Sequence, residues 1–151
     1  MGSRTSIHTR YNGHIISKLI FLVALTGIAG PLATFAGPAE DEASKAGEKW
    51  ISLLDNQKYE ESWTQAASMF RDQVTQEQWL ISLKRFRDPL GTLVSRAASR
   101  VDFTTSLRGA PDGEYAIIHF TTSFRNKNDV TERLTLVKED GKWRMAAYAI
   151  H

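Results

Sequence analysis

Cysteine is absent from all 151 residues of the chain. Its absence excludes disulfides, thiolate catalysis, metal sites built on cysteine and lipid attachment to a cysteine behind a leader. An exported domain without disulfides must be stabilised by an ordinary apolar core. Four Trp, four Tyr and seven Phe residues can supply one.

Histidine and the common catalytic motifs are also scarce. Beyond residue 36 the chain has only His119 and His151, with no H-E-x-x-H or comparable spacing. Neither a G-x-S-x-G motif nor a glycine-rich phosphate or dinucleotide motif is present. We therefore expect no metal site and no cofactor, and the sequence does not support common serine hydrolysis.

A strong excess of charge of one sign is lacking as well. The 19 Lys and Arg against 17 Asp and Glu give a formal charge of +2. Arg4, Arg10 and Lys18 lie within residues 1–36, which have no acidic residue, so the rest of the chain has a formal charge of −1. The basic balance belongs to the first 36 residues, and we expect no nucleic-acid partner.

One apolar run is present, from Leu19 to Gly30. It follows the three basic residues and precedes small residues at Thr34 and Ala36, the order typical of an export signal. The run is short for a membrane span. We predict a signal peptide over residues 1–36, cleaved near Ala36, which leaves a single domain over residues 37–151. The protein would be exported, to the periplasm in a bacterium, with no stable membrane span after cleavage.

The mature chain first shows helical periodicity and then alternation with a period of two. Apolar residues at three- and four-residue spacing predict helices over 41–54, from 59 to about 67, and over 75–86. Thr75 and Gln78 fit a capping box, and Asp88-Pro89 ends the third helix. Alternation predicts strands over 93–107, 115–124, about 131–138 and 143–150, with a tight hairpin at Asp140-Gly141.

This order predicts an α+β domain in which three N-terminal helices pack on a curved, cone-like antiparallel meander of four strands. Several short motifs are spread over the mature chain: Ser62-Trp63, Ala66-Ala67, Phe70-Arg71, Gln78-Trp79, Pro89-Leu90-Gly91, the segment 109–115 (GAPDGEY), Thr122-Ser123-Phe124, and the segment 140–144 (DGKWR) with Tyr148. In these motifs the chain resembles domain-of-unknown-function family 4019. The resemblance implies a small exported bacterial domain and brings no catalytic residues. The element order also resembles the nuclear transport factor 2-like, or cystatin-like, superfamily.

Two functions stay open. The first is a non-catalytic module, in which the cone encloses a pocket for a small apolar ligand or the sheet face pairs with a second copy of the chain. Aromatic residues could line such a pocket, although each fits a plain core position equally well. These are Trp50, Trp63, Trp79, Phe120, Phe124 and Tyr148.

The alternative is a small-pocket enzyme of the ketosteroid isomerase or polyketide cyclase type. Proton transfer would use His119, Asp102, Tyr115 or Tyr148, because an apolar pocket shifts a pKa towards working pH. Alternation places Ile118 and Phe120 inward, so His119 should point away from the helices. Asp102 is predicted to share a solvated face with Arg96 and Arg100.

A basic stretch is the last candidate. Lys84, Arg85, Arg87, Arg96 and Arg100, with Arg108 at the end of the stretch, could form a patch for an anionic partner such as a lipid headgroup or an acidic protein. A solvated helix end beside an exposed strand face explains the same residues, and we favour that interpretation.

Overall fold

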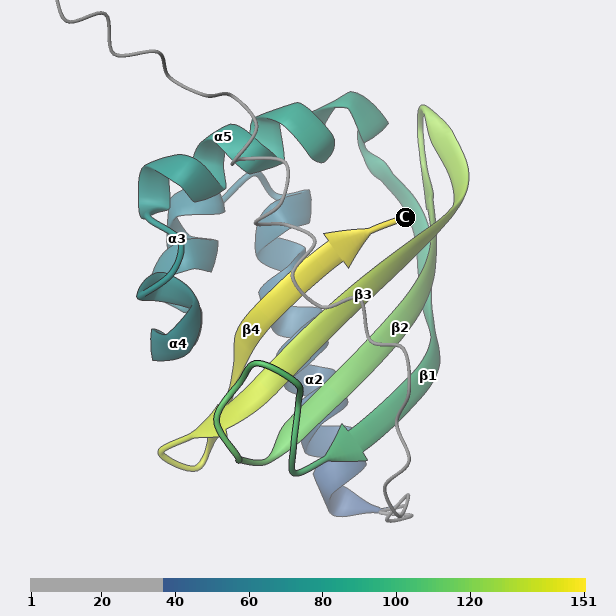
Figure 1. Cartoon of the computed structure of the whole chain (residues 1–151). Coiled ribbons are helices and arrows are strands. Elements are labelled where there is room, and N and C mark those ends of the chain that lie inside the picture. The colour runs from purple at the N-terminus through teal and green to yellow at the C-terminus, as the bar shows by residue number, and fades with distance from the viewer. Residues whose placement is uncertain (1–36) are drawn as a thin grey trace, which may run out of the picture.

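The computed structural model describes residues 37–151, which form an α+β domain (Figure 1). The helical part comprises α2 (Pro38–Asp55), α3 (Tyr59–Thr64), α4 (Ser68–Arg71) and α5 (Gln76–Phe86), followed by a 3₁₀ turn over Asp88–Leu90. The first and third predicted helices are confirmed. The second predicted helix ends early, at Thr64, and the chain forms α4 as a separate short helix.

Local signals explain where the two long helices begin. Pro38 occupies the first turn of α2, where its missing N–H is not needed, and Glu40 and Asp41 face the positive end of the helix dipole. At α5 the capping box is formed: Thr75 accepts a hydrogen bond from the N–H of Gln78, whose side chain in turn accepts one from the N–H of Thr75.

The strands form one open antiparallel sheet in the order β1–β2–β3–β4, as the meander predicted. They are β1 (Leu93–Thr104), β2 (Tyr115–Phe124), β3 (Lys127–Glu139) and β4 (Lys142–Ile150). Asp140 and Gly141 both adopt positive φ, 50° and 72°, at the predicted tight hairpin between β3 and β4.

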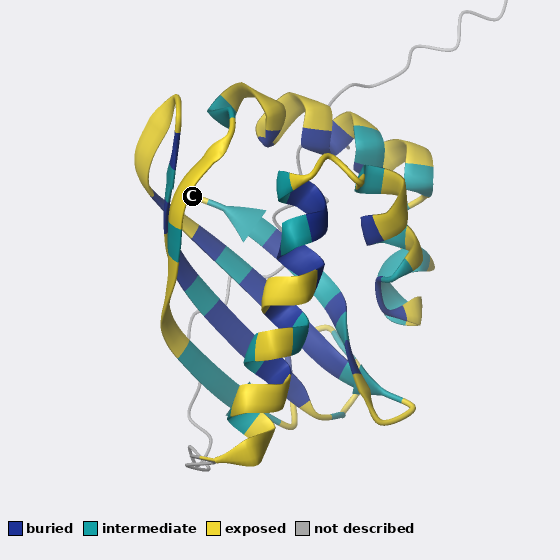
Figure 2. Ribbon diagram, turned by 180° about the vertical axis from the view of Figure 1, so that it is seen from behind, coloured by how far each residue is buried: buried dark blue, intermediate teal, exposed yellow. Residues whose placement is uncertain are grey.

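The main core lies between the helices and one face of the sheet, called here the inner face. In Figure 1 α2 runs behind the sheet, and α3, α4 and α5 lie beside the β4 edge. Ile118, Leu134 and Leu136 project towards α2, and Gly47 lets the helix approach them closely. Figure 2 shows buried residues concentrated where α2 faces the sheet.

The opposite, outer face of the sheet is only partly covered. The segment 105–114 between β1 and β2 folds across its lower part (Figure 1). There Leu107 packs with Tyr115, Ile117 and Val137 in a second, smaller apolar cluster that also includes Ala67.

A bulge in β1 corrects one prediction about the faces of this strand. Ala98 is opposite Phe120 and Arg100 is opposite His119, so Ser99 is an extra residue in β1. An extra residue inverts which face the side chains before it occupy. Arg96 therefore points to the inner face, while Arg100 and Asp102 remain on the outer face as predicted.

None of the helices in residues 37–151 combines the length and apolarity that a membrane crossing requires.

Candidate functional site

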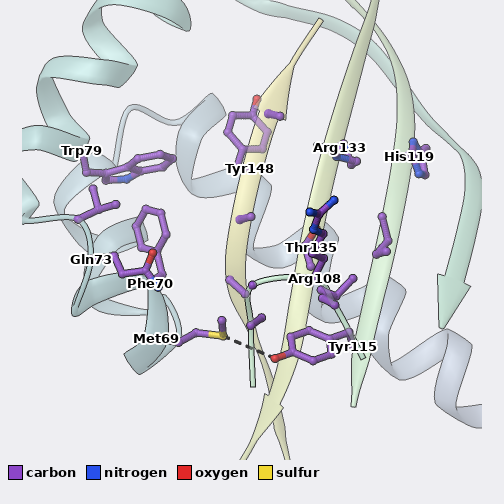
Figure 3. A pocket seen from close by; sticks show the side chains of 18 of the residues that line it. Met69, Phe70, Gln73, Trp79, Arg108, Tyr115, His119, Arg133, Thr135 and Tyr148 are labelled. Carbon is purple, nitrogen blue, oxygen red and sulfur yellow. Dashed lines mark hydrogen bonds between the residues drawn. The ribbon is translucent and has the colours of Figure 1, made fainter. Parts of the chain in front are cut away.

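A pocket of about 310 Å³ opens on the outer face next to β4. Its floor is formed by β4, β3 and β2, one side by α4 and α5, and one end by the segment 107–110 (Figure 3). Four consecutive residues of β4, 146–149, line it, three of which are alanines. These small side chains leave the space that the pocket occupies.

The wall on the helical side is apolar and aromatic. Met69, Phe70 and Trp79 approach β4 from this side in Figure 3. The rings of Phe70 and Trp79 meet edge to face, with centroids 5.2 Å apart. Trp79 is held in place because its indole N–H donates to the buried hydroxyl of Ser62 at 2.9 Å. An ordered aromatic wall of this kind suits an apolar ligand.

The wall on the strand side is polar and cationic. Arg133 and Thr135 from β3, His119 from β2 and Arg108 from the segment after β1 lie over the strands in Figure 3. Arg100 and Asp102 complete this side and form an ion pair of 2.7 Å. Asp102 is the single acidic residue in the lining, against three arginines.

Behind the pocket, the Tyr148 hydroxyl donates to Glu132, a carboxylate with no exposed surface. Glu132 also accepts hydrogen bonds from the Thr122 hydroxyl at 2.5 Å and from Arg96 Nε at 2.7 Å. Arg96 in turn pairs with Asp55 at 2.6 Å. Burial would lower the pKa of Arg96, but its hydrogen bonds to Asp55 and Glu132 outweigh burial and raise it.

Arg87 completes this network from the end of α5. It is 3% exposed, pairs with Asp55 at 2.9 Å and stacks 4.1 Å from the centre of the Phe124 ring. The buried charges are therefore paired, as their burial requires. They join α2, α5, β1 and β3 in one structural unit.

The groups suited to proton transfer lie at the pocket but are engaged. Burial raises the pKa of the Tyr148 hydroxyl, and the Glu132 carboxylate raises it further. The Tyr115 hydroxyl donates to the carbonyl of Pro111 at 2.6 Å, and burial raises its pKa too. The pKa of His119 is lowered by burial, against the opposing effect of Asp102, whose carboxylate lies 3.9 Å from Nε2. Because both tyrosine hydroxyls donate to protein acceptors and have raised pKa values, neither Tyr115 nor Tyr148 is poised to act as a base near neutral pH.

The six predicted aromatic residues do not lie together at this pocket. Trp79 and Tyr148 line it, whereas Trp50, Phe120 and Phe124 are buried in the interior. Trp63 packs against the core and donates its indole N–H to the Val74 carbonyl at 2.7 Å. All four residues of the enzyme alternative, His119, Asp102, Tyr115 and Tyr148, do line the pocket. His119 points away from α2, but it faces the pocket that α4 and α5 border, so the prediction that it points away from the helices holds for α2 alone.

The candidate basic residues do not form one continuous surface, and the favoured interpretation of a solvated helix end beside an exposed strand face does not hold for Arg87 and Arg96. Arg87 and Arg96 are buried in ion pairs with Asp55 and Glu132, so neither side chain is available to an external partner. Lys84 and Arg85 are exposed on α5, and Arg100 is exposed on the outer face. The bulge at Ser99 and the burial of the α5 C-terminus separate residues that lie close in sequence.

Sequence reasoning missed Met69, Gln73, Arg108 and Arg133 as lining residues. Arg133 and Thr135 alternate with the buried Leu134, so strand parity could have identified both. No local pattern marks Met69 or Arg108 as a pocket residue, because α4 and the segment 105–114 reach the pocket only through the tertiary fold.

The fold and the pocket define the class: a small α+β domain with a meander sheet and a ligand-sized pocket on the face opposite its longest helix. The model of the protein family of unknown function DUF4019 matches residues 46–148. The chain belongs to this family, in agreement with the resemblance of its motifs. No protein with a curated description matches the sequence.

Proposed function

We propose that this protein is an exported, non-catalytic module that binds a small, largely apolar molecule in the outer-face pocket. The pocket itself carries the proposal: about 310 Å³ bordered by Met69, Phe70 and Trp79 lies within the range of small-molecule sites. Proton transfer by the enzyme alternative has less support, because both pocket tyrosines donate to protein acceptors.

The helices before a four-strand antiparallel meander also support a place in the nuclear transport factor 2-like superfamily, which we include in the proposal. The leader pattern of residues 1–36 supports export; those residues lie outside the described part of the chain.

A neutral fluorescent probe tests binding directly. N-phenyl-1-naphthylamine should increase in fluorescence with saturation on titration into residues 37–151. Ala147→Leu should weaken this binding at least about tenfold, because the longer side chain fills the pocket floor. Ala97→Leu is the matched control, because Ala97 lies opposite Thr121 on the same outer face of the sheet but outside the pocket.

Equal binding by both variants, or no saturable binding to the unaltered protein, would reject the proposal. The rival module, in which two copies pair through the outer face, predicts a different result. Sedimentation should then show a dimer that Ala147→Leu and Ala97→Leu both weaken.

A further inference from the structure

We infer that the ligand of this pocket is an amphipathic anion: an apolar body against the helical wall and one negatively charged group, such as a carboxylate, against the strand wall. The inference rests on the proposed function and names the chemical class of its ligand. Its first basis is the division of the pocket into two chemically different walls.

The division follows the elements. Phe70 and Trp79 stand on the helical side, and the nitrogen-bearing ends of Arg133 and His119 lie on the strand side (Figure 3). Since the pocket is small, one ligand that fills it touches both walls. A purely apolar molecule would desolvate the polar wall without replacing its hydrogen bonds, which opposes binding.

Charge decides the sign of the polar group. The lining carries Arg100, Arg108 and Arg133 against the single carboxylate of Asp102, a formal charge of +2 with His119 neutral. Arg100 already pairs with Asp102, which neutralises both. The positive formal charge of the lining favours an anion and opposes a cation of the same shape.

Arg108 is the side chain best placed to add a contact. It follows the buried Leu107, which anchors the segment in the smaller apolar cluster, and its own side chain is exposed at the mouth of the pocket. A guanidinium offers a fork of donors that matches a carboxylate. Thr135, which also lines the pocket, adds a hydroxyl on the floor of the strand side.

Three ligands with the same ten-carbon chain and different head groups test the inference: decanoate, decanol and decylamine. Each is titrated below its micelle-forming concentration into residues 37–151, by displacement of N-phenyl-1-naphthylamine. Decanoate should bind at least about tenfold more tightly than decylamine, with decanol between them. Added NaCl should weaken binding of decanoate and leave that of decanol unchanged, because salt screens the charged contact only.

Arg108→Gln should weaken decanoate about fivefold and leave decanol unaffected, because it removes one partly solvated charge. Arg125→Gln is the matched control: Arg125 is exposed in the turn between β2 and β3 and does not line the pocket. It should bind decanoate as the unaltered protein does. Urea unfolding of both variants checks that the fold is retained.

The outcomes separate the two proposals. Equal affinity for the three ligands, or tighter binding of decylamine, overturns the anion inference and leaves the pocket as a binding site. Failure of all three to displace a bound probe overturns the anion inference alone. Absence of any saturable probe binding overturns the proposed function and this inference together.

Discussion

Among single residues, Glu132 is a carboxylate that is fully buried and therefore needs hydrogen-bond partners for its charge. It accepts hydrogen bonds from Arg96, Thr122 and Tyr148. Burial of a charge is costly unless every lone pair is engaged, and here the engaged partners come from three different strands. Glu132 thus fixes the register of β1, β2 and β4 around β3 while supporting the Tyr148 ring at the pocket.

Replacing Glu132 tests this arrangement. Glu132→Gln keeps the shape but leaves Arg96 with Asp55 as its remaining anionic partner, so the free energy of unfolding should fall by about 3 kcal/mol. Urea denaturation followed by tryptophan fluorescence gives the value. Glu114→Gln is the control: Glu114 is exposed and lies 3.9 Å from Lys138, so its loss should cost at most about 1 kcal/mol. Equal losses in the two variants would contradict the structural role of Glu132.

His119 gives the domain a predicted dependence on pH. Burial lowers its pKa in the folded state, and Arg133 and Arg100 add to this effect while Asp102 opposes it. The unfolded chain therefore binds the proton more readily, so stability from this residue is present above about pH 6.5 and is lost as pH falls towards the folded-state pKa.

The pH effect is measured as a difference between variants. Urea unfolding at pH 7 and at pH 5 gives the free energy of unfolding at each pH. This free energy should fall less between pH 7 and pH 5 in His119→Gln than in the unaltered protein. Because His119 is only partly buried, the difference should be small. A steeper loss in His119→Gln than in the unaltered protein would reverse the predicted sign.

At the scale of elements, the packing of α2 on the sheet depends on Gly47. A Cβ at this position would lie 2.6 Å from Ile118 Cδ1 and 3.2 Å from Leu134 Cδ2. Alanine favours a helix over glycine by about 1 kcal/mol, whereas overpacking of a core costs about 1–3 kcal/mol. We expect Gly47→Ala to lower the free energy of unfolding by about 1 kcal/mol.

A double-mutant cycle tests whether the contact with Ile118 is the cause. Ile118→Val removes the Cδ1 atom that the new methyl group would strike. In the Ile118→Val background, Gly47→Ala should therefore be neutral or stabilising. Strict additivity of the two substitutions in urea denaturation would show that α2 and β2 do not meet at this point.

Elements with local signals were predictable, and those set by tertiary contacts were not. Asp88-Pro89 marked the end of α5, and Asp140-Gly141 marked the turn between β3 and β4, because proline and positive φ act through local geometry. The bulge at Ser99 has no such signature, since its sequence, Ala98-Ser99-Arg100, would suit a regular strand. The face of Arg96 was predicted wrongly for this reason.

At the scale of the whole molecule, the pocket is assembled from segments far apart in sequence. Met69, Arg108 and Ala147 meet there because the segment 105–114 folds across the outer face and α4 lies beside β4. The sequence predicted an aromatic-lined pocket, and it placed Trp79 and Tyr148 among the candidates. It could not separate them from Trp50 and Phe120, because burial in a core and lining of a pocket favour the same residue types.

The point at which the folded domain begins in the chain leads to a prediction about export. Helix α2 begins at Pro38 and its first core residue is Ala43, so the described fold starts directly after the proposed cleavage point at Ala36. Cleavage there would leave every described helix and strand intact. We expect the periplasmic protein from a bacterial host to begin at Gly37, as measured by intact mass.

The small residue before the cleavage point provides the test of this boundary. Ala36→Leu should block processing, because signal peptidases require a small side chain at that position, and the recovered mass should include residues 1–36. Ala39→Leu, an exposed position within the first turn of α2, should be processed normally. A periplasmic product of the unaltered chain that begins at Met1 would contradict the signal peptide. The domain would then reach its compartment with its basic leader attached, and its net charge would stay at +2 rather than −1.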